Sequence, residues 1–331
     1  MSKSLLNKIS HWTKQFVEDP EYKIAQFVLR FIDSDRLPDR LFIKYQFHYA
    51  FGYPLNLKHP RTFNEKLNWM KLYDRNPLYT TLVDKYAVKK WVANRIGDRY
   101  IIPTIKVYNR VDEIDLDELP NQFVLKCTHD SGSVVVCQDK ENFDFDSAKM
   151  VLQKGLNTNF YLKHREWPYK NVPHRIIAEE YMEDIGNSSL PDYKFFCFDG
   201  EPKFMFVATE RSNPNEETKF DFFDMEYHHL SCTNGHPNAR VMPVKPKHFE
   251  EMKRLARELS AGLKHVRVDL YEVGETVYFG EMTMFHWGGE MKFNPEDFDV
   301  SFGEYLRVSR RMHSSRGGGL LIISFSASME Y

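Results

Sequence analysis

The sequence has few of the features that mark metalloproteins, secreted proteins or membrane proteins. It contains only four cysteines in 331 residues, and they form neither a CxxC pair nor a zinc-ligand spacing, as is typical of reduced thiols in a cytoplasmic protein. The N-terminus lacks an uninterrupted apolar core of signal-peptide length, and no apolar run approaches the roughly 18 residues of a membrane span. We therefore expect a cytoplasmic protein with no transmembrane segment, for which peripheral contact with a membrane stays open.

An excess of either charge is also missing. The 45 lysines and arginines balance 47 aspartates and glutamates, which argues against a nucleic-acid partner. No Ser-His-Asp or Cys-His nucleophile is evident, and the histidines follow no metal-ligand spacing, which favours surface or core positions for them. With 42% hydrophobic and 28% charged residues, the composition is that of a globular protein large enough for two or three lobes.

What the sequence does contain is a charged hairpin at residues 266–288, VRVDLYEVGETVYFGEMTMFHWG. Its first half alternates apolar and polar residues, the period of a half-buried strand, and Val277–Thr283 runs back after a short turn that contains a glycine. A turn centred near Glu275 makes Asp269 and Glu281 neighbours on one face, with Cβ atoms roughly 5 Å apart. Two carboxylates so placed repel unless a cation lies between them, and their oxygens suit Mg²⁺.

Arg267 shares that face, two residues before Asp269, where it could meet an anion beside the metal. The alternative is an edge hairpin whose charged face simply looks into water, as many antiparallel sheets do. The spacing alone leaves both interpretations open.

A second motif is a lysine at the end of a strand. Phe123–Cys127 ends at Lys126-Cys127 and continues into the small polar loop THDSGS, residues 128–133. A lysine and loop amides can hold phosphate oxygens, although this is no Walker A sequence and a plain hairpin turn has the same composition.

Further along, an apolar strand runs into two acids in Arg175–Met182. The next strand, Asp192–Phe198, ends at Asp199-Gly200, which is a strong hairpin signal. Lys194 lies on the same face as aromatic residues of this strand, so its ammonium group needs either water or an anionic partner.

Helical patterns fill most of the rest. Thr62 precedes Glu65 as in a capping box, a helix is expected over 84–96 before Gly97, another over 146–167, and another within 246–265. Residues 100–108 read as a short strand entering a Rossmann-like lobe. After Leu306 the composition turns to a small-residue and arginine-rich tail, which we expect to be poorly ordered.

In their order along the chain, these motifs resemble the ATP-grasp superfamily. More narrowly, the chain resembles the TupA-like ATP-grasp family of cell-surface polysaccharide gene clusters, whose founding role is teichuronopeptide synthesis. The similarity runs from about Phe51 to Leu306 and is carried by the phrases RTFNEKL, DKYAVKKWV, FVLKCTHDSGS, DYKFFCFDG and VRVDLYEV…YFGEMT.

The resemblance implies an α+β fold in which two α+β lobes clasp ATP, preceded by a helical and Rossmann-like region. The expected divisions are an N-terminal helical region at 1–60, a pre-ATP-grasp-like region at 61–120, a lid at 121–182, a core with the metal-binding hairpin at 183–306, and the tail at 307–331.

The resemblance also implies roles for single residues. Lys126 and Lys194 would hold the phosphates of ATP, under a lid loop made of Ser131, Gly132 and Ser133. The hinge against adenine would comprise Glu179, Glu180, Tyr181 and Met182, and Asp192 would contact the ribose. Mg²⁺ would be held by Asp269 and Glu281, while Arg267 and Lys194 would act on the transferred phosphoryl group. Thr283 stands where many ATP-grasp enzymes have asparagine, which leaves one or two metal ions open.

The function that the resemblance implies is an ATP-dependent carboxylate–amine ligase. It would form a C–N (amide) bond through an acyl phosphate and attach an amino acid or peptide to a surface polysaccharide or its precursor. A glycosyltransferase of the same pathway is the alternative, with a DxD metal site at Asp115/Asp117, Asp144/Asp146 or Asp297/Asp299. A non-catalytic nucleotide-binding partner is a third hypothesis, against which both lysines and both carboxylates weigh.

Overall fold

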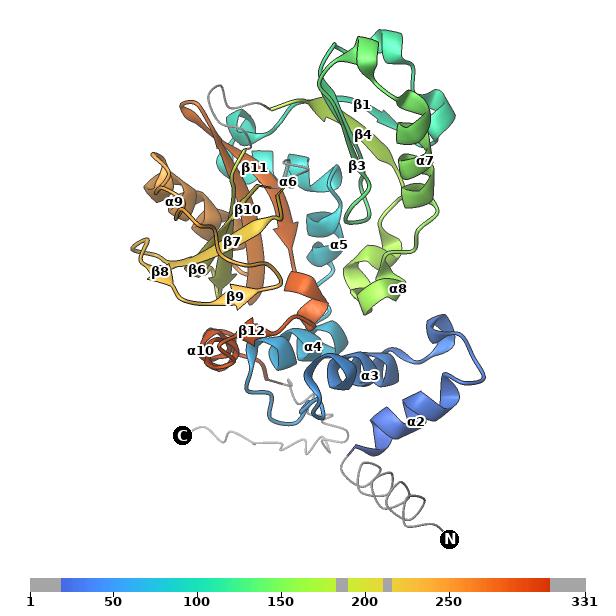
Figure 1. The fold of residues 1–331 in the computed structure, drawn as a ribbon, viewed down its shortest axis with the longest axis vertical. Coiled ribbons are helices and arrows are strands. Elements are labelled where there is room, and N and C mark those ends of the chain that lie inside the picture. Colours follow the sequence, from blue (N-terminus) through green and yellow to red (C-terminus); the bar gives the residue numbers. More distant parts are fainter. Residues whose placement is uncertain (1–18, 183–189, 211–215, 310–331) are drawn as a thin grey trace, which may run out of the picture.

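The structure is a computed structural model that describes residues 19–182, 190–210 and 216–309. Its described part contains two antiparallel sheets of four and six strands, a two-stranded sheet and a set of helices (Figure 1). Within these residues no helix is both long and apolar enough to cross a membrane. Most of the predicted tail, residues 310–331, lies outside the described residues.

The smaller lobe is built on the four-stranded sheet, in the order β1-β4-β2-β3. Its strands are β1 (Thr104–Tyr108), β2 (Phe123–Cys127), β3 (Val134–Cys137) and β4 (Ile176–Glu180), and α7 (Phe145–Leu156) packs against β2 and β3. Because β1 pairs with β4 in this sheet, the expectation that residues 100–108 enter a Rossmann-like lobe is wrong. The sequence of this short strand is compatible with either kind of lobe. The antiparallel pairing with β4 places it in the four-stranded sheet instead of a parallel, Rossmann-like one.

The larger lobe is built on the six-stranded sheet, in the order β11-β10-β5-β6-β7-β8. The strands are β5 (Asp192–Phe198), β6 (Glu201–Thr209), β7 (Lys219–Asp224), β8 (His229–Leu230), β10 (His265–Val273) and β11 (Thr276–Thr283). Every residue of β5 is buried, because α9 (Phe249–Ser260) covers one face and α4 (Phe63–Tyr73) supplies Phe63 to the other. The two small strands β9 (Thr233–Asn234) and β12 (Phe293–Asn294) pair separately.

The predicted Asp-Gly hairpin joins β5 to β6. Asp199 and Gly200 have φ of 47° and 85°, which are the two positive values that a type I′ turn requires. This turn matches the twist of the flanking strands. After a register shift between Phe196 and Cys197, Lys194 lies opposite Phe206 on β6, and its other neighbour across the sheet is Asp269 on β10.

Helices connect and support the two lobes. The N-terminal part contains the α-helices α2 (Pro20–Val28), α3 (Asp39–Phe51), α4, α5 (Leu78–Val83) and α6 (Ala87–Ile96). Two further α-helices are α8 (Tyr161–His164) and α10 (Asp297–Tyr305). The short 3₁₀ helices are η1 (Ser34–Arg36), η2 (Asp98–Tyr100), η3 (Val111–Glu113), η4 (Leu116–Glu118), η5 (Lys140–Asn142), η6 (Trp167–Asn171) and η7 (His286–Gly289). The capping box predicted at Thr62 and Glu65 is confirmed. The single helix expected over 146–167 is instead α7 and α8, separated by the segment 157–160.

Candidate active site

The hairpin β10–β11 places the two predicted metal ligands opposite each other. Asp269 pairs directly with Glu281, as predicted, but the turn is centred between Gly274 and Glu275, and the register shifts between Asp269 and Leu270. Gly280 is the extra residue of this bulge. A Cβ atom there would lie 2.7 Å from the Tyr271 ring and 3.1 Å from the Asp269 carbonyl oxygen, so a glycine is required for the close approach.

Asp269 is buried, and both of its carboxylate oxygens accept hydrogen bonds from cationic side chains. Arg267 donates to both of its carboxylate oxygens, each at 2.7 Å, and Lys194 donates to Oδ2 as well. Burial alone would raise the pKa of the Asp269 carboxyl, but Arg267 and Lys194 outweigh burial and hold that pKa below its ordinary value. The cations that the carboxylate pair needs are therefore supplied by the chain itself, and the expectation of a merely solvated hairpin face is wrong for Asp269.

Arg267 is fixed from three further directions. It donates to Thr283 Oγ1 at 2.9 Å and contacts His286 Nδ1 at 2.9 Å, and its NH2 atom lies 4.0 Å from Glu281. Asn234 donates its amide group to two backbone carbonyls, so its Oδ1, 2.9 Å from His286 Nε2, must accept. His286 therefore carries its proton on Nε2 and accepts from Arg267 on Nδ1. Burial, followed by Arg267 and Lys194, lowers the pKa of His286, which agrees with a neutral ring.

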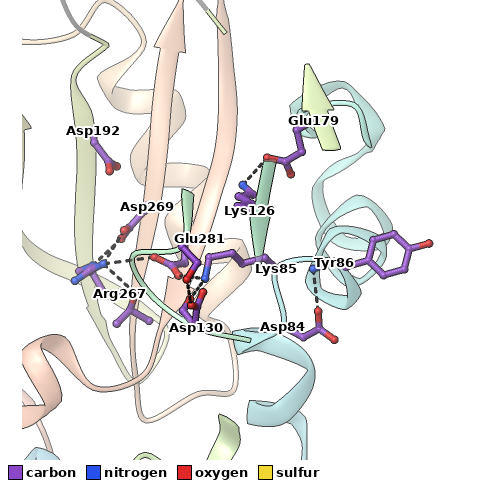
Figure 2. A network of polar contacts seen from close by, with 12 residues as sticks. Asp84, Lys85, Tyr86, Lys126, Asp130, Glu179, Asp192, Arg267, Asp269 and Glu281 are labelled. Atoms are coloured by element: carbon purple, nitrogen blue, oxygen red, sulfur yellow. Dashed lines mark hydrogen bonds and ion pairs between the residues drawn. The ribbon is translucent and has the colours of Figure 1, made fainter. Parts of the chain in front are cut away.

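Glu281 is the more accessible of the two acids. Its side chain is 30% exposed, and its nearest described cation is Lys85, 3.4 Å away. Lys85 also donates to the backbone carbonyl of Asp130, so it links the hairpin to the loop after β2 (Figure 2). Burial raises the pKa of Glu281, but Lys85 and Arg267 more than offset this and lower it. Glu281 is thus an ionised carboxylate with oxygen atoms open to a ligand.

The predicted phosphate lysine and the first predicted hinge residue are partners. Lys126 forms an ion pair with the buried Glu179 (Figure 2), and Lys89 forms a second one. Burial raises the pKa of Glu179, but the two lysines outweigh it and lower that pKa. The Glu179 side chain therefore orients two ammonium groups.

The remaining predicted residues separate into two groups. Ser131, Gly132, Glu180, Tyr181 and Met182 line a cavity of about 510 Å³ together with Lys85, Lys89, Lys126, Glu179 and Glu281. Ser133 and Asp192 are not among the residues that line it: Ser133 donates to Asp130, and Asp192 is buried with an oxygen 2.5 Å from Lys194 Nζ. The cavity walls also include Val124, Val136 and Phe279. Apolar walls beside lysines and carboxylates are the lining that a nucleotide needs.

A second cavity, of about 330 Å³, begins where the first one ends. Ser131 and Glu281 line both cavities. Lys194, Arg267 and Thr283 line the second one, together with a set of aromatic and charged side chains that includes Phe160, Lys163, Glu166, Phe220, His236 and Trp287. The cationic pair on Asp269 therefore faces the second cavity, while Lys89 and Lys126 face the first.

Sequence reasoning missed three residues of this site, namely Lys85, Lys89 and His286. Lys85 and Lys89 lie in the phrase DKYAVKKWV, one just before α6 and one in its first turn, where Asp84 accepts backbone hydrogen bonds from Tyr86 and Ala87. The signal was the four-residue spacing of the two lysines, which places them close together at the start of one helix. Nothing in the sequence marked His286, whose role depends on packing.

The acids on the hairpin fit a divalent cation that arrives with a phosphate ligand. Within the described ranges no group of three or more histidine, cysteine, aspartate or glutamate side chains is positioned to hold a metal. Mg²⁺ does not need such a group, because it binds through one or two carboxylates and completes its shell with phosphate oxygens and water. Glu281 has free oxygen atoms for this purpose, and Asp269 and Thr283 lie beside it on the same hairpin.

Comparison with known proteins identifies the family. The family described as TupA-like ATPgrasp matches residues 65–307, while no curated protein matches the sequence. Similar solved structures include a D-alanine–D-alanine ligase from Bacillus anthracis complexed with ATP (16% identity, TM-score 0.37, covering 62% of this chain and 55% of that one). A D-alanine–D-alanine ligase from Helicobacter pylori (13%, 0.38, 68% and 57%) and the ATP-grasp ligase PsnB with a precursor peptide and AMPPNP (9%, 0.39, 73% and 64%) are further examples.

In each of these three structures, the match covers less than two thirds of the neighbour's own length. The family match instead covers most of the present chain, and it contains the strands of both lobes and both cavities. The chain therefore belongs to the TupA-like ATP-grasp family and has its α+β ATP-grasp fold.

Proposed function

We propose that the protein is an ATP-dependent carboxylate–amine ligase. The observation that carries the proposal is the pair of adjoining cavities, which meet at Glu281 and Ser131 with Arg267 and Lys194 on the far side of the junction. A nucleotide in the first cavity would present its terminal phosphate to a second substrate in the other. Phosphoryl transfer needs mainly positioning and charge neutralisation, and these are the groups that the junction provides.

In the proposed reaction, a substrate carboxylate oxygen attacks the γ-phosphorus of ATP, and ADP leaves. An amine nitrogen then attacks the carbonyl carbon of the acyl phosphate, phosphate leaves, and the nitrogen loses a proton as the amide forms. Lys126 and Lys89 would hold phosphate oxygens, and Arg267 and Lys194 would stabilise the charge on the transferred group. Mg²⁺ bound by the open oxygens of Glu281 would neutralise phosphate charge, and Asp269, the second proposed ligand, would have to give up a contact with Arg267 or Lys194 to join it.

Residues 180–182, at the end of β4, would contact the adenine, as the family resemblance implies, and the Ser131-Gly132 loop would cover the phosphates. Asp192 is the proposed ribose contact, although its link to Lys194 also suits a role in orienting that lysine. Following the same resemblance, the carboxylate would belong to a surface polysaccharide or its precursor in the cytoplasm, and the amine to an amino acid or peptide.

The glycosyltransferase alternative loses its motif support. Asp115 accepts a hydrogen bond from the Asp117 backbone, Asp144 caps α7 through Ser147, and Asp299 accepts from the Asn64 backbone. No member of the three DxD pairs is among the residues that line the two cavities. Each pair thus has a structural role in the described part of the chain.

Trapping of the acyl phosphate tests the proposal. The protein, Mg-ATP and a panel of uronic acids would be incubated with hydroxylamine, and ADP and hydroxamate would be measured. We expect both products with at least one acid, in equal amounts. Hydroxamate absent from every reaction, together with UDP release from a sugar nucleotide, would favour the glycosyltransferase instead.

A further inference from the structure

The second cavity contains an acid that the proposed reaction does not yet use. Glu166 lies between α8 and η6 and lines this cavity. Its residue surface is only 5% exposed, and within the described residues its carboxylate makes no ion pair within 4 Å and no side-chain hydrogen bond. The Glu166 oxygens are not among the fully buried atoms that lack a partner, so they reach the cavity that the residue lines. A carboxylate with no cation of the described chain beside it is costly to ionise there, which points to a cationic ligand that completes it.

The neighbouring acid Glu290 has two basic groups close by, although its Oε1 atom accepts no hydrogen bond. Glu290 lies 3.0 Å from His164 Nδ1 and 3.6 Å from the buried Lys71 ammonium group. Lys71 directs its other contacts to the carbonyl oxygens of His164 and Gly288, at 2.8 and 2.7 Å. The buried Lys71 is therefore occupied by Glu290 and two backbone carbonyls, and no cation of the described chain pairs with Glu166.

The electrostatics agree with this geometry. Burial raises the pKa of Glu166 to about 8, an effect that Lys71 only partly opposes and to which Glu290 and Glu281 add. The other charged group that acts on it is Lys163. A bound cation would reverse the balance and ionise the carboxyl group.

We propose that the second cavity is the binding site of the amine substrate, and that Glu166 binds the primary ammonium group and then takes one proton from it. This proposal rests on the ligase function and names its nitrogen substrate as a primary amine that is charged in solution. The proton passes from the ammonium nitrogen to the Glu166 carboxylate, which leaves a neutral amine to attack the acyl phosphate. The second proton leaves with the departing phosphate, so the step balances.

The lining of the cavity supports this assignment. Phe160, Tyr169, Phe220 and Trp287 form an aromatic wall, and aromatic faces attract ammonium groups as well as apolar carbon. Trp287 is 40% exposed and adopts a left-handed backbone conformation with φ of 50°. The cations Arg267 and Lys194, which also line the cavity, suit the negatively charged acid substrate and its phosphoryl group, whereas the unpaired Glu166 suits the amine.

Binding measurements with the full chain test the proposal. The protein, saturated with Mg²⁺ and a non-hydrolysable ATP analogue, is titrated calorimetrically at pH 7 with primary amines and their desamino counterparts. The pairs are L-alanine with propionate, glycinamide with acetamide, and glucosamine with glucose. We expect at least one amine to bind more tightly than its counterpart and to release a proton to the buffer. Glu166→Gln should weaken that amine at least tenfold and abolish the proton release.

Glu290→Gln is the matched control, because it makes the same substitution at a nearby acid that does not line the cavity. We expect at most a threefold change with this variant. Three results would overturn the proposal: amines that bind no better than their counterparts, parent-like binding by Glu166→Gln, or equal weakening by both variants.

Hydroxylamine separates this proposal from the ligase function. It is neutral near pH 7 and needs no carboxylate to bind an ammonium group. Glu166→Gln should therefore lose amide formation by at least tenfold more than it loses hydroxamate formation. Hydroxamate missing from the parent contradicts the ligase function, whereas equal losses of both products in Glu166→Gln contradict the role of Glu166.

Discussion

Two buried carboxyl groups near the second cavity have opposite surroundings. Asp269 is 1% exposed and contacts two cations, Arg267 and Lys194, whereas Glu166 is 5% exposed and contacts none. The pKa of Asp269 is accordingly lowered, and that of Glu166 is raised to about 8. Similar burial thus gives an ionised, pre-organised group in one place and a neutral group in the other. The difference indicates which charge belongs to the fold and which awaits a ligand.

Asp269→Asn should cause the largest change in the free energy of unfolding. The substitution keeps the shape of the side chain but leaves Arg267 and Lys194 as buried cations without their shared anion. Breaking a buried ion pair on one side costs about 3–5 kcal/mol, so the free energy of unfolding should fall by that amount. Urea denaturation at pH 7 measures this change. A loss below 1 kcal/mol would show that the three side chains are not coupled as the structure has them.

Glu166→Gln should instead raise the free energy of unfolding, by an amount that depends on pH. Because the carboxyl has a pKa near 4.5 when unfolded and about 8 when folded, the folded parent loses stability as pH rises between these values. Removing the group should therefore stabilise the protein by roughly 2–4 kcal/mol more at pH 8 than at pH 5. Urea midpoints of parent and variant at several pH values test this, with Lys71, Lys163, Glu281 and Glu290 as the other charged groups around the site.

The cross-strand pair on the hairpin shows what sequence could predict and where it fell short. Alternation and a central glycine predicted two strands, and Asp269 does face Glu281. The turn lies near Glu275, as predicted, but the bulge was missed: without the extra residue Gly280, the register of 270 with 279 would continue to 269 with 280 and turn Glu281 to the other face. A bulge depends on packing against Tyr271, which no local pattern encodes.

The cations of the site were harder to predict than its acids. Lys126 and Lys194 lay on recognisable strands, so their placement near acids could be expected. Lys85 reaches Glu281 across 196 positions of sequence, and His286, the first residue of the short helix η7, reaches Arg267 only through the tertiary fold. The unpaired state of Glu166 is equally a property of packing, since it depends on where Lys71 directs its donors.

Glu281→Gln should have the smallest effect on the fold and a clear effect on ligand binding. The side chain is 30% exposed with its nearest cation at 3.4 Å, and such pairs contribute at most about 1 kcal/mol. The unfolding free energy without ligand should therefore stay within about 1 kcal/mol of the parent.

Mg-ATP at about 100 times its Kd should stabilise the parent by roughly 2.7 kcal/mol, and the variant should lose most of this gain at the same concentration. Glu272→Gln on the other strand of the hairpin, where the acid contacts His248 instead of a cavity, should keep it. Equal stabilisation of all three proteins by Mg-ATP would contradict the role of Glu281, and it would mean that the open carboxylate on this hairpin, unlike Glu166, awaits no ligand.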